Sequence, residues 1–359
     1  MDKKLERILP RVQKPARYVG GEYHQIVKER SETEVRVAFC FPDTYEIGMS
    51  NLGMRILYGV MNRMPGVWCE RVFAPWGDME DEMRRAGVEL YALESGDALS
   101  AFDMIAFTVG YEMSYTNLLN MLRLGNIPIR AKERHGLEHM VFAGGACVYN
   151  PEPLAEFVDF FSVGEGEEIT VEILELYRRA KREGWTKKTF LREVCRIEGV
   201  YVPSFYTHHY GADGRLETVE PEAFAPAHVK KRIVQNLDDA LYPTDFIVPN
   251  TEIVHDRSNL EVMRGCIRGC RFCQAGYTYR PVRPRSPELL LTQAVKSLES
   301  TGCHEITLSS LSTSDYKGLA ELADGLLDYC RPRKINVSLP SLRADNFSQE
   351  LMERVQTVR

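Results

Sequence analysis

The hydrophobic pattern switches between two periods along most of the chain. Short unbroken apolar runs, beginning with VRVAFCF at residues 35–41, are typical of strands in a parallel sheet that is covered on both faces. Amphipathic helical stretches separate these runs, and the first covers about residues 52–64. Three further strands are predicted in RVFAPW, MIAFTVG and MVFAGGA, and two further helices in DMEDEMRRAG and SYTNLLNMLRLG. This alternation predicts an α/β fold with a Rossmann-like, doubly wound parallel sheet.

The pattern then changes character, which divides the chain into four parts. The stretch FVDFFSVGEGEEIT predicts a last strand, a Gly-Glu-Gly turn and a helix whose acidic first turn suits the helix dipole. After it, RIEGVYVPSFYTHHYGADGRLETV predicts a strand, a turn and a strand. We therefore expect a polar lead-in at 1–34, a Rossmann-like domain at 35–194, a β-rich connector at 195–258 and a second α/β domain at 259–359.

The second α/β domain repeats one simple unit. Its predicted strands are LEVMRG, HEITLSS and INVSLPS, and its predicted helices lie at about 287–300, 316–329 and 347–356. These elements make three strand-helix units. Because ligands of parallel α/β proteins bind where the strands end, the loops after these strands are candidates for carrying the chemistry.

Composition and charge narrow the class of protein. The 359 residues are enough for two domains, and the chain has neither a run of 18 apolar residues nor a charged-then-apolar leader. A net charge of -6 with both signs interspersed is not typical of an obligate polyanion binder, although nucleic acid stays undecided. We interpret the basic run at Arg280, Arg283 and Arg285 as a solvated loop. We expect a soluble, cytoplasmic protein with no membrane contact.

The cysteines carry the strongest chemical signal. Nine cysteines, an odd number, indicate reduced thiols, and three of them form a group at Cys266, Cys270 and Cys273 in EVMRGCIRGCRFCQAG. This CxxxCxxC spacing places three thiolates on one loop, enough to bind three irons of a 4Fe-4S cluster while the fourth stays open to a ligand. One alternative is a zinc site completed by Cys303 or His304, although zinc sites usually have two CxxC-like pairs. A structural, chemically inert cluster is the other.

At these residues the chain resembles the radical S-adenosylmethionine (radical SAM) superfamily. The likeness includes Phe272, directly before the third cysteine, and the pair Arg264-Gly265 that leads from a strand into the loop. It implies a 4Fe-4S cluster whose open iron binds S-adenosylmethionine. It also implies that one electron, from a donor such as flavodoxin or ferredoxin, cleaves the sulfonium bond. The resulting 5'-deoxyadenosyl radical then abstracts a hydrogen atom from a substrate that the sequence does not identify.

The resemblance also implies a partial TIM barrel of six strand-helix units, of which 259–359 would form the first half. We therefore expect a truncated barrel in a fragment: either a second chain completes the barrel, or the cofactor site is incomplete. Within this half, the resemblance implies cofactor contacts by Phe272, by Ser309 and Ser310 at the end of the second strand, and by Arg343 after the third. Many members have Gly-Gly-Glu where this chain has serines, and capping its own loop is the alternative role of Arg343.

The first domain resembles the cobalamin-binding-like domain of other radical SAM proteins. The likeness rests on its Gly-Gly loop, its Gly-Glu-Gly-Glu turn and the strings FPDTYEIGMSNLG and NPEPLAEFVDFF, which narrow it to an uncharacterised family and extend it over nearly the whole chain. The loops FPDTYEIGMSN, VGYEMSYTN and GGACVYNPEP would line one rim of the sheet. Cobalamin is therefore a candidate cofactor, although the lower-ligand string DxHxxG is absent.

A methylthiotransferase-like first domain would instead bind a second cluster on cysteines at strand ends. Cys40 and Cys147 lie at the ends of predicted strands, with Cys69 as a third candidate, but the string FTVGYE has no cysteine. We interpret these three as small buried residues. That architecture also suggests, by analogy, an RNA-modifying enzyme. A further hypothesis is a non-catalytic fragment, or a binding protein whose cluster or zinc ion is structural. We assign no catalytic residue.

Overall fold

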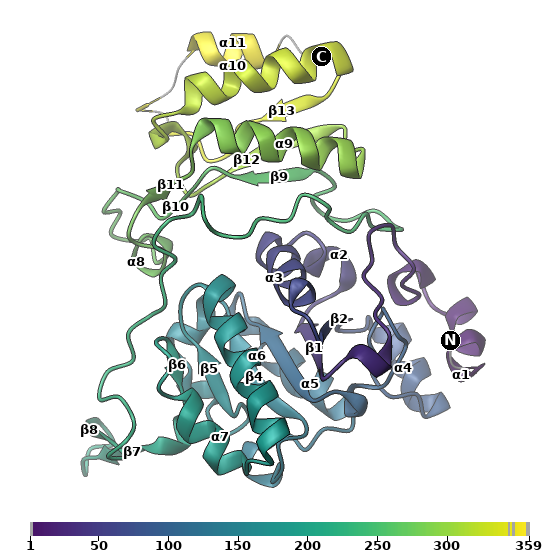
Figure 1. The fold of residues 1–359 in the computed structure, drawn as a ribbon, viewed down its shortest axis with the longest axis vertical. Helices are drawn as coiled ribbons and strands as arrows, with labels where there is room; N and C mark the ends of the chain where they lie inside the picture. The colour runs from purple at the N-terminus through teal and green to yellow at the C-terminus, as the bar shows by residue number, and fades with distance from the viewer. Residues whose placement is uncertain (1–2, 344, 347–348, 357–359) are drawn as a thin grey trace. The chain divides into compact units, whose positions relative to one another are not determined.

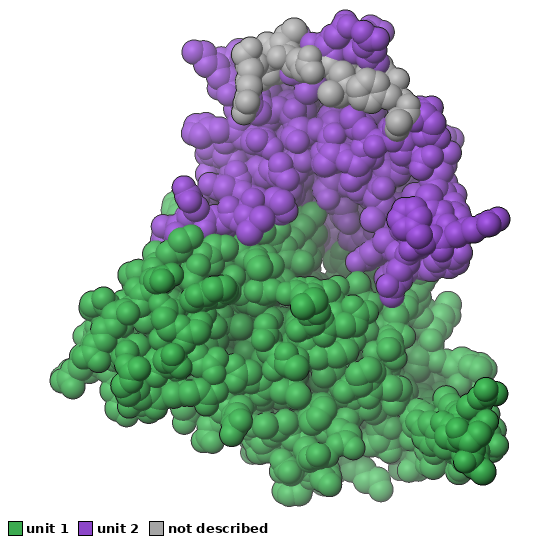
Figure 2. Space-filling model, turned by 180° about the vertical axis from the view of Figure 1, so that it is seen from behind, with its two compact units in different colours: residues 1–233 green, residues 234–359 purple. Residues whose placement is uncertain are grey.

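The computed structural model describes residues 3–343, 345–346 and 349–356. The chain forms two compact units, Met1–Ile233 and Val234–Arg359, which Figure 2 distinguishes by colour. Each unit contains its own parallel sheet and is described by itself. In the part of the chain that the structure describes, every helix is too short or too polar to cross a membrane.

A six-stranded sheet forms the centre of the first unit, in the order β2-β1-β3-β4-β5-β6, and Figure 1 labels all of its strands except β3. The first five strands run parallel, and β6 is antiparallel to β5. Chain order reverses between β1 and β3, which makes this the switch point of a doubly wound sheet. The predicted Rossmann-like sheet is confirmed. The strands are β1 Val35–Phe41, β2 Val67–Phe73, β3 Met104–Thr108, β4 Met140–Gly144, β5 Phe160–Ser162 and β6 Val200–Tyr201.

Helices follow the strands as predicted. Asn51 caps α3 (Leu52–Arg63), the second helix after β1, because its side chain accepts a hydrogen bond from the N–H of Met54 at 2.9 Å. The Gly-Glu-Gly turn before α6 requires its first glycine, since a Cβ on Gly164, which has φ of +113°, would lie 2.2 Å from the carbonyl oxygen of Arg232. The helices are α1 Lys3–Ile8, α2 Tyr45–Gly48, α3 Leu52–Arg63, α4 Gly77–Ala86, α5 Tyr115–Leu124, α6 Gly166–Glu183 and α7 Lys187–Val194.

Strand β2 covers Val67–Phe73 rather than the predicted 71–76, because two buried charged residues interrupt its apolar pattern. Glu70 accepts a hydrogen bond from Nε of Arg36 at 3.1 Å. Arg71 is also buried, and its charge is balanced by two carboxylates from other segments. Ion pairing thus allows charged residues in a strand that is buried along its whole length.

In the predicted lead-in, the described residues 3–34 belong to the first compact unit. Leu5 and Ile8 of α1 are each only 2% exposed. Glu22 is also buried, and its carboxylate accepts hydrogen bonds from both terminal nitrogens of Arg71, at 2.9 and 2.8 Å. The lead-in therefore contributes both apolar contacts and a buried charge to the sheet domain.

The predicted connector, residues 195–258, is divided between the two units. Strand β6 joins the sheet of the first unit, and β7 (Tyr206–Tyr210) pairs with β8 (Leu216–Pro221) in an exposed hairpin. Residues 222–257, all of which the structure describes, contain no helix or named strand. The hydroxyl of Tyr242 donates to the carbonyl of Asn259, so the last part of the connector packs on the second unit.

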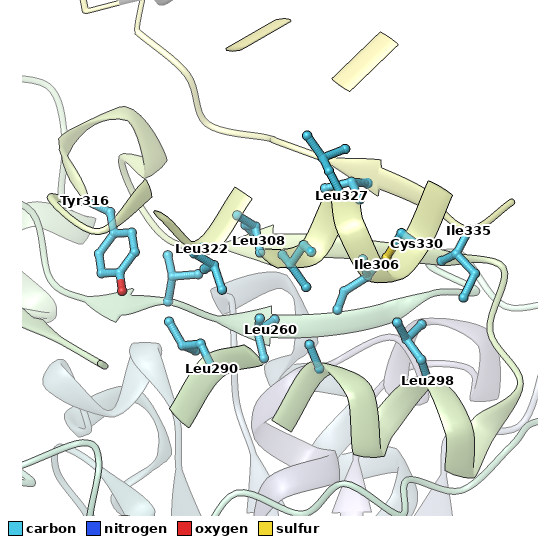
Figure 3. Packing of buried hydrophobic residues seen from close by; sticks show 14 of the residues in the cluster. Leu260, Leu290, Leu298, Ile306, Leu308, Tyr316, Leu322, Leu327, Cys330 and Ile335 are labelled. Atoms are coloured by element: carbon cyan, nitrogen blue, oxygen red, sulfur yellow. The ribbon is translucent and has the colours of Figure 1, made fainter. Parts of the chain in front are cut away.

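The second unit contains the three predicted strand-helix units. Its parallel sheet has the order β13-β12-β9, formed by Asn336–Ser338, Glu305–Ser309 and Ser258–Glu261. Figure 3 shows leucines of the helices after β9 and β12 gathered around these strands in one apolar core. The helices are α9 Pro287–Thr301, α10 Leu319–Cys330 and α11 Gln349–Gln356.

Candidate functional site

The three cysteines lie on one loop, residues 266–273, shortly after the carboxyl end of β9. The short strand β10 (Met263–Arg264) leads into this cysteine loop and pairs antiparallel with β11 (Arg283–Pro284), and helix α8 (Ala275–Thr278) follows it. Gly265 opens the loop with φ of +87°, and a Cβ there would lie 2.5 Å from the carbonyl oxygen of Pro281. The bend into the cysteine loop therefore requires glycine.

Cys266, Cys270 and Cys273 are half-buried and form no disulfide. The N–H of Arg268 donates to Sγ of Cys266 at 3.4 Å, and the N–H of Cys273 donates to the carbonyl of Cys270 at 3.1 Å. The three sulfurs do not converge: among the described residues, no three His, Cys, Asp or Glu side chains are grouped so that they could hold a metal ion. The thiols nevertheless fit a 4Fe-4S cluster as donors, and binding one requires the loop to bring them together.

The two predicted serines end the second strand of the unit. The carbonyl of Ser309, the last residue of β12, accepts the N–H of Val262 at 3.0 Å. The hydroxyl of Ser310 bonds that of Thr313 at 2.9 Å and accepts the N–H of Ser312 at 3.3 Å. Ser310 thus stabilises the turn after β12. The cofactor contacts of both serines stay predictions.

Arg343 follows β13 and lies near the cysteine loop. Its guanidinium donates to both carboxylate oxygens of Asp345, at 2.9 and 2.8 Å. These hydrogen bonds and the negative charge of Asp345 raise the pKa of the guanidinium, and both Arg268 and Cys270 of the cysteine loop lie close enough to influence it. Pairing with Asp345 fits the loop-capping role, while the proximity of Cys270 fits a cofactor role. Phe272 lies on the cysteine loop with 94% of its surface exposed.

Asp315 joins the cysteine loop to the loop after β12, and the sequence analysis missed it. Arg268 donates from Nε to Oδ2 at 3.0 Å and from Nη2 to Oδ1 at 2.5 Å. Ser312 donates its hydroxyl proton to Oδ2 at 2.7 Å. These donors, Arg268 above all, hold the pKa of the Asp315 carboxyl well below its usual range. The arginine between two cysteines is visible in the sequence, but its partner lies 47 residues away, where no local pattern identifies it.

The basic run after the cysteine loop is mostly buried, so its interpretation as a solvated loop is wrong for Arg283 and Arg285. They are 8% and 2% exposed. Nη1 of Arg283 donates to the carbonyl of Val234 at 2.6 Å, and Arg285 donates to the carbonyl of Leu237. Glu261 at the end of β9 lies 3.5 Å from Nη2 of Arg285. Backbone carbonyls of the connector and this carboxylate therefore contact the terminal nitrogens of the two buried guanidinium groups, while Nε of Arg285 is buried without a hydrogen-bond partner among the described residues.

The loops after the strands of the first unit make contact along one edge of its sheet. The hydroxyl of Tyr111, after β3, donates to the carboxylate of Asp43, after β1. The N–H of Cys147, after β4, donates to the carbonyl of Val109 at 3.1 Å. We call this edge the rim of the first unit. It lies at the switch point of the sheet, where doubly wound proteins bind ligands.

Two groups at the rim of the first unit have shifted pKa values. The hydrogen bond to Asp43 raises the pKa of Tyr111 to about 12. Burial and the negative charge of Glu112 raise the pKa of the Cys147 thiol to about 11. Cys40 and Cys69 are fully buried in β1 and β2, and burial raises the pKa of both thiols, as their interpretation as small buried residues expects.

Two family models match the chain. The model for radical SAM proteins, N-terminal, matches residues 53–203, and the model for the radical SAM superfamily matches residues 260–358. The second match includes the whole cysteine loop.

A curated protein is similar to the chain in sequence, and solved structures are similar to it in fold. The uncharacterized protein MJ0966 of Methanocaldococcus jannaschii is 26% identical over 317 residues, which cover 88% of this chain and 57% of that protein. The chain thus spans little more than half the length of this curated relative.

Two solved structures of the radical S-adenosylmethionine methyltransferase TsrM from Kitasatospora setae share the fold, each at 13% identity and over 90% of this chain. One, with tryptophan and a SAM analog bound, has a TM-score of 0.54 and is covered to 57%. The other, with cobalamin and a [4Fe-4S] cluster bound, has a TM-score of 0.52 and is covered to 59%.

A doubly wound domain followed by parallel strand-helix units, with a cysteine triplet after the first of these strands, is the architecture of a radical SAM protein. Both family matches fall on these two parts of the chain, and the solved structures share their fold. The chain belongs to the radical SAM superfamily.

Proposed function

We propose that this protein is an enzyme that binds a 4Fe-4S cluster on Cys266, Cys270 and Cys273 and cleaves S-adenosylmethionine reductively. The observation that carries the proposal is the placement of three free, half-buried thiols on one loop shortly after β9, inside the region that the superfamily model matches. A bound cluster would supply one electron for breaking the sulfonium bond, so that methionine and, after a hydrogen atom is taken from the substrate, 5'-deoxyadenosine are released.

The chain's own residues would hold and orient the cofactors. The three thiolates would bind three irons of the cluster, which would leave the fourth iron open to the amino and carboxylate groups of S-adenosylmethionine. The carbonyl and hydroxyl oxygens of Ser309 and Ser310 are proposed acceptors for the amino group. Arg343 is the proposed partner of the carboxylate, in exchange for Asp345, because a guanidinium binds carboxylates with two parallel hydrogen bonds. Phe272 is proposed to cover the bound cofactor with its exposed ring.

The reaction also needs partners from outside this chain. A small one-electron donor such as flavodoxin or ferredoxin is proposed to reduce the cluster. All nine cysteines are free, which suits a reducing compartment, and we propose the cytoplasm. A second chain that completes the barrel stays an expectation of the sequence, and the substrate is unassigned.

Cobalamin is the proposed second cofactor, at the rim of the first unit. The rim lies at the switch point between β1 and β3, where a doubly wound sheet offers a binding crevice. The residues in contact there, Tyr111, Asp43 and Cys147, include no histidine, so cobalamin would bind without a histidine ligand from them. Adding hydroxocobalamin to the protein and following its visible absorption spectrum tests this. A spectrum identical to that of free hydroxocobalamin would count against the proposal.

Cleavage of S-adenosylmethionine tests the main proposal. The protein is reconstituted with iron and sulfide without oxygen and reduced with dithionite, and 5'-deoxyadenosine and methionine are then measured. We expect both products from the intact protein and neither from Cys270→Ser, whereas Cys303→Ser, a thiol outside the cysteine loop, keeps the activity. A reconstituted protein that holds iron but releases no 5'-deoxyadenosine would favour the alternative of a non-catalytic or structural cluster protein.

An RNA-modifying role is the other alternative. It requires RNA binding that weakens as the salt concentration rises, because phosphate contacts release counterions. Absence of such binding would rule this role out.

A further inference from the structure

Arg268 stands between two of the cysteines, and its side chain leaves the cysteine loop to form a two-pronged ion pair. Its Nε and Nη2 atoms lie 3.0 and 2.5 Å from the two carboxylate oxygens of Asp315. The side chain of Asp315 is 5% exposed and that of Arg268 is 34% exposed. Paired hydrogen bonds between a guanidinium and a carboxylate fix direction as well as distance. The ion pair therefore determines where the middle of the Cys266–Cys270 segment lies.

The carboxylate end of this pair is fixed in the unit. Asp315 lies two residues after Thr313, which is fully buried. The hydroxyl of Thr313 donates to the carbonyl of Leu308 in β12 at 3.4 Å, and its N–H donates to the carbonyl of Ser341, after β13, at 3.2 Å. Asp315 is thereby anchored to the ends of both strands whose following loops carry the predicted cofactor residues.

The other end of the pair is fixed to the cysteine loop through the backbone of Arg268. Its N–H donates to Sγ of Cys266 at 3.4 Å, and its carbonyl accepts a hydrogen bond from Nη2 of Arg280 at 2.8 Å. Two other side chains of the loop, Arg271 and Phe272, are exposed. Fixing the position of the Arg268 side chain therefore also restricts the position of its peptide group, which contacts the sulfur of Cys266.

We propose that Arg268 is a positioning residue whose ion pair with Asp315 holds the cysteine loop in register with the loops after β12 and β13. The proposal rests on the proposed function, which assigns those loops to S-adenosylmethionine. Without the pair, three cysteines remain to bind a cluster, but cluster and cofactor are no longer held at a set distance. Reactions depend steeply on such positioning.

Charge alone makes a different prediction from positioning. Removing the positive Arg268 lowers the reduction potential of a nearby cluster, because the more negative reduced form loses an attraction, whereas neutralising Asp315 raises it. A positioning role weakens cofactor binding in the same direction in both variants. The two effects can therefore be separated by comparing the direction in which cofactor binding changes in the two variants.

The experiment uses the full chain with Arg268→Ala, Asp315→Asn, the double variant and Arg268→Lys. Arg271→Ala is the matched control, since it removes an exposed arginine from the same loop. Amide hydrogen exchange of residues 266–274 is followed before reconstitution. After reconstitution, iron content is measured, and the electron paramagnetic resonance signal is titrated with S-adenosylmethionine.

We expect faster exchange of this segment in both single variants, with iron content near that of the intact protein. The S-adenosylmethionine concentration for a half-maximal change in the signal should rise by about tenfold, the lower end of what outer-shell substitutions at metal sites cost. The double variant should need no higher S-adenosylmethionine concentration than the more strongly affected single variant, because the two residues act as one unit. Cofactor binding by Arg268→Lys should lie between that of the intact protein and that of Arg268→Ala, since an ammonium group cannot donate two parallel hydrogen bonds to one carboxylate.

Three results would overturn the proposal. If Arg268→Ala exchanges and binds cofactor like Arg271→Ala, the pair does not hold the loop. If exchange rises but the titration with S-adenosylmethionine is unchanged, the pair is structural only. If the intact protein forms a cluster whose signal does not respond to S-adenosylmethionine, the proposed function itself fails, and the positioning role fails with it.

Discussion

Arg71 offers a direct test of how the first unit is held together. It lies in the buried strand β2, where its guanidinium balances two buried carboxylates, Glu22 and Glu94, at N–O distances of 2.8 and 2.6 Å. The change Arg71→Met keeps an unbranched apolar side chain but leaves both carboxylates uncompensated. Breaking a buried ion pair in this way costs about 3–5 kcal/mol of unfolding free energy. We expect a loss of that size at pH 7.

The pH dependence follows from the pKa of Glu22. In the intact protein burial opposes its ionisation, but the attraction of Arg71 outweighs burial and keeps the pKa below its usual value. Without Arg71 burial raises that pKa, so the folded state binds a proton that the unfolded state has released. Holding a glutamate neutral costs about 3.7 kcal/mol at pH 7 and about 1 kcal/mol at pH 5, at about 1.36 kcal/mol per pH unit. Burial raises the pKa of Glu94 even in the intact protein, so Glu22 carries most of this change, and the deficit of Arg71→Met should shrink by about 2.7 kcal/mol between pH 7 and pH 5.

Urea unfolding followed by tryptophan fluorescence measures this effect in the first unit alone, because Trp68, Trp76 and Trp185 are the three tryptophans of the chain and all lie within it. Arg196→Met, which breaks an exposed ion pair, is the control and should lose less than about 0.5 kcal/mol. A loss below about 1 kcal/mol for Arg71→Met, or an equal loss at both pH values, would refute the reasoning.

Two further predictions concern the two candidate sites. Gly265→Ala should reduce the iron retained after reconstitution, because a Cβ would lie 2.5 Å from the carbonyl oxygen of Pro281. Gly269→Ala is the control and should keep the iron, because the space around Gly269 is open. Equal iron content in both variants would contradict this prediction. Asp43→Asn should lower the pKa of Tyr111 from about 12 toward about 10, because the carboxylate favours the protonated phenol. Difference absorbance of tyrosinate against pH checks the second prediction, and an unchanged titration would contradict it.

The parallel sheets could be predicted because most of their strands are apolar along their whole length. Strands β1, β3 and β4 begin at the predicted residues, since each is buried on both faces. Strand β2 was misplaced because Glu70 and Arg71 interrupt its apolar run. Their partners come from other segments, and local periodicity carries no information about them.

Residues 1–34 and 195–258 show the same limit on a larger scale. The polar composition of residues 1–34 predicted a lead-in. Glu22, one of these polar residues, is in fact buried inside the unit, where it pairs with Arg71. The end of the connector packs on the second unit through backbone carbonyls, such as that of Val234, which accepts a hydrogen bond from Arg283. Contacts through backbone carbonyls cannot be predicted from the pattern of side chains, because every residue has a carbonyl group.

At the cysteine loop, spacing alone predicts that three residues form a ligand set, because a cluster needs several thiolates within a short reach, and this role stays a prediction. Spacing could not identify Asp315, which belongs to another strand-helix unit and meets Arg268 only through the parallel sheet. The rim of the first unit was predicted correctly as three loops, since parallel strands end at one edge. The Tyr111–Asp43 contact within it depends on side-chain direction and needed the structure.

The central claim is that the cysteine loop binds a cluster with one iron open to S-adenosylmethionine. The most direct test is the electron paramagnetic resonance spectrum of the anaerobically reconstituted, reduced protein, recorded with and without S-adenosylmethionine. The account predicts a cluster signal that changes when the cofactor is added and that is lost in Cys270→Ser. A cluster signal that is identical with and without the cofactor, or a protein that binds zinc in place of iron, would contradict it.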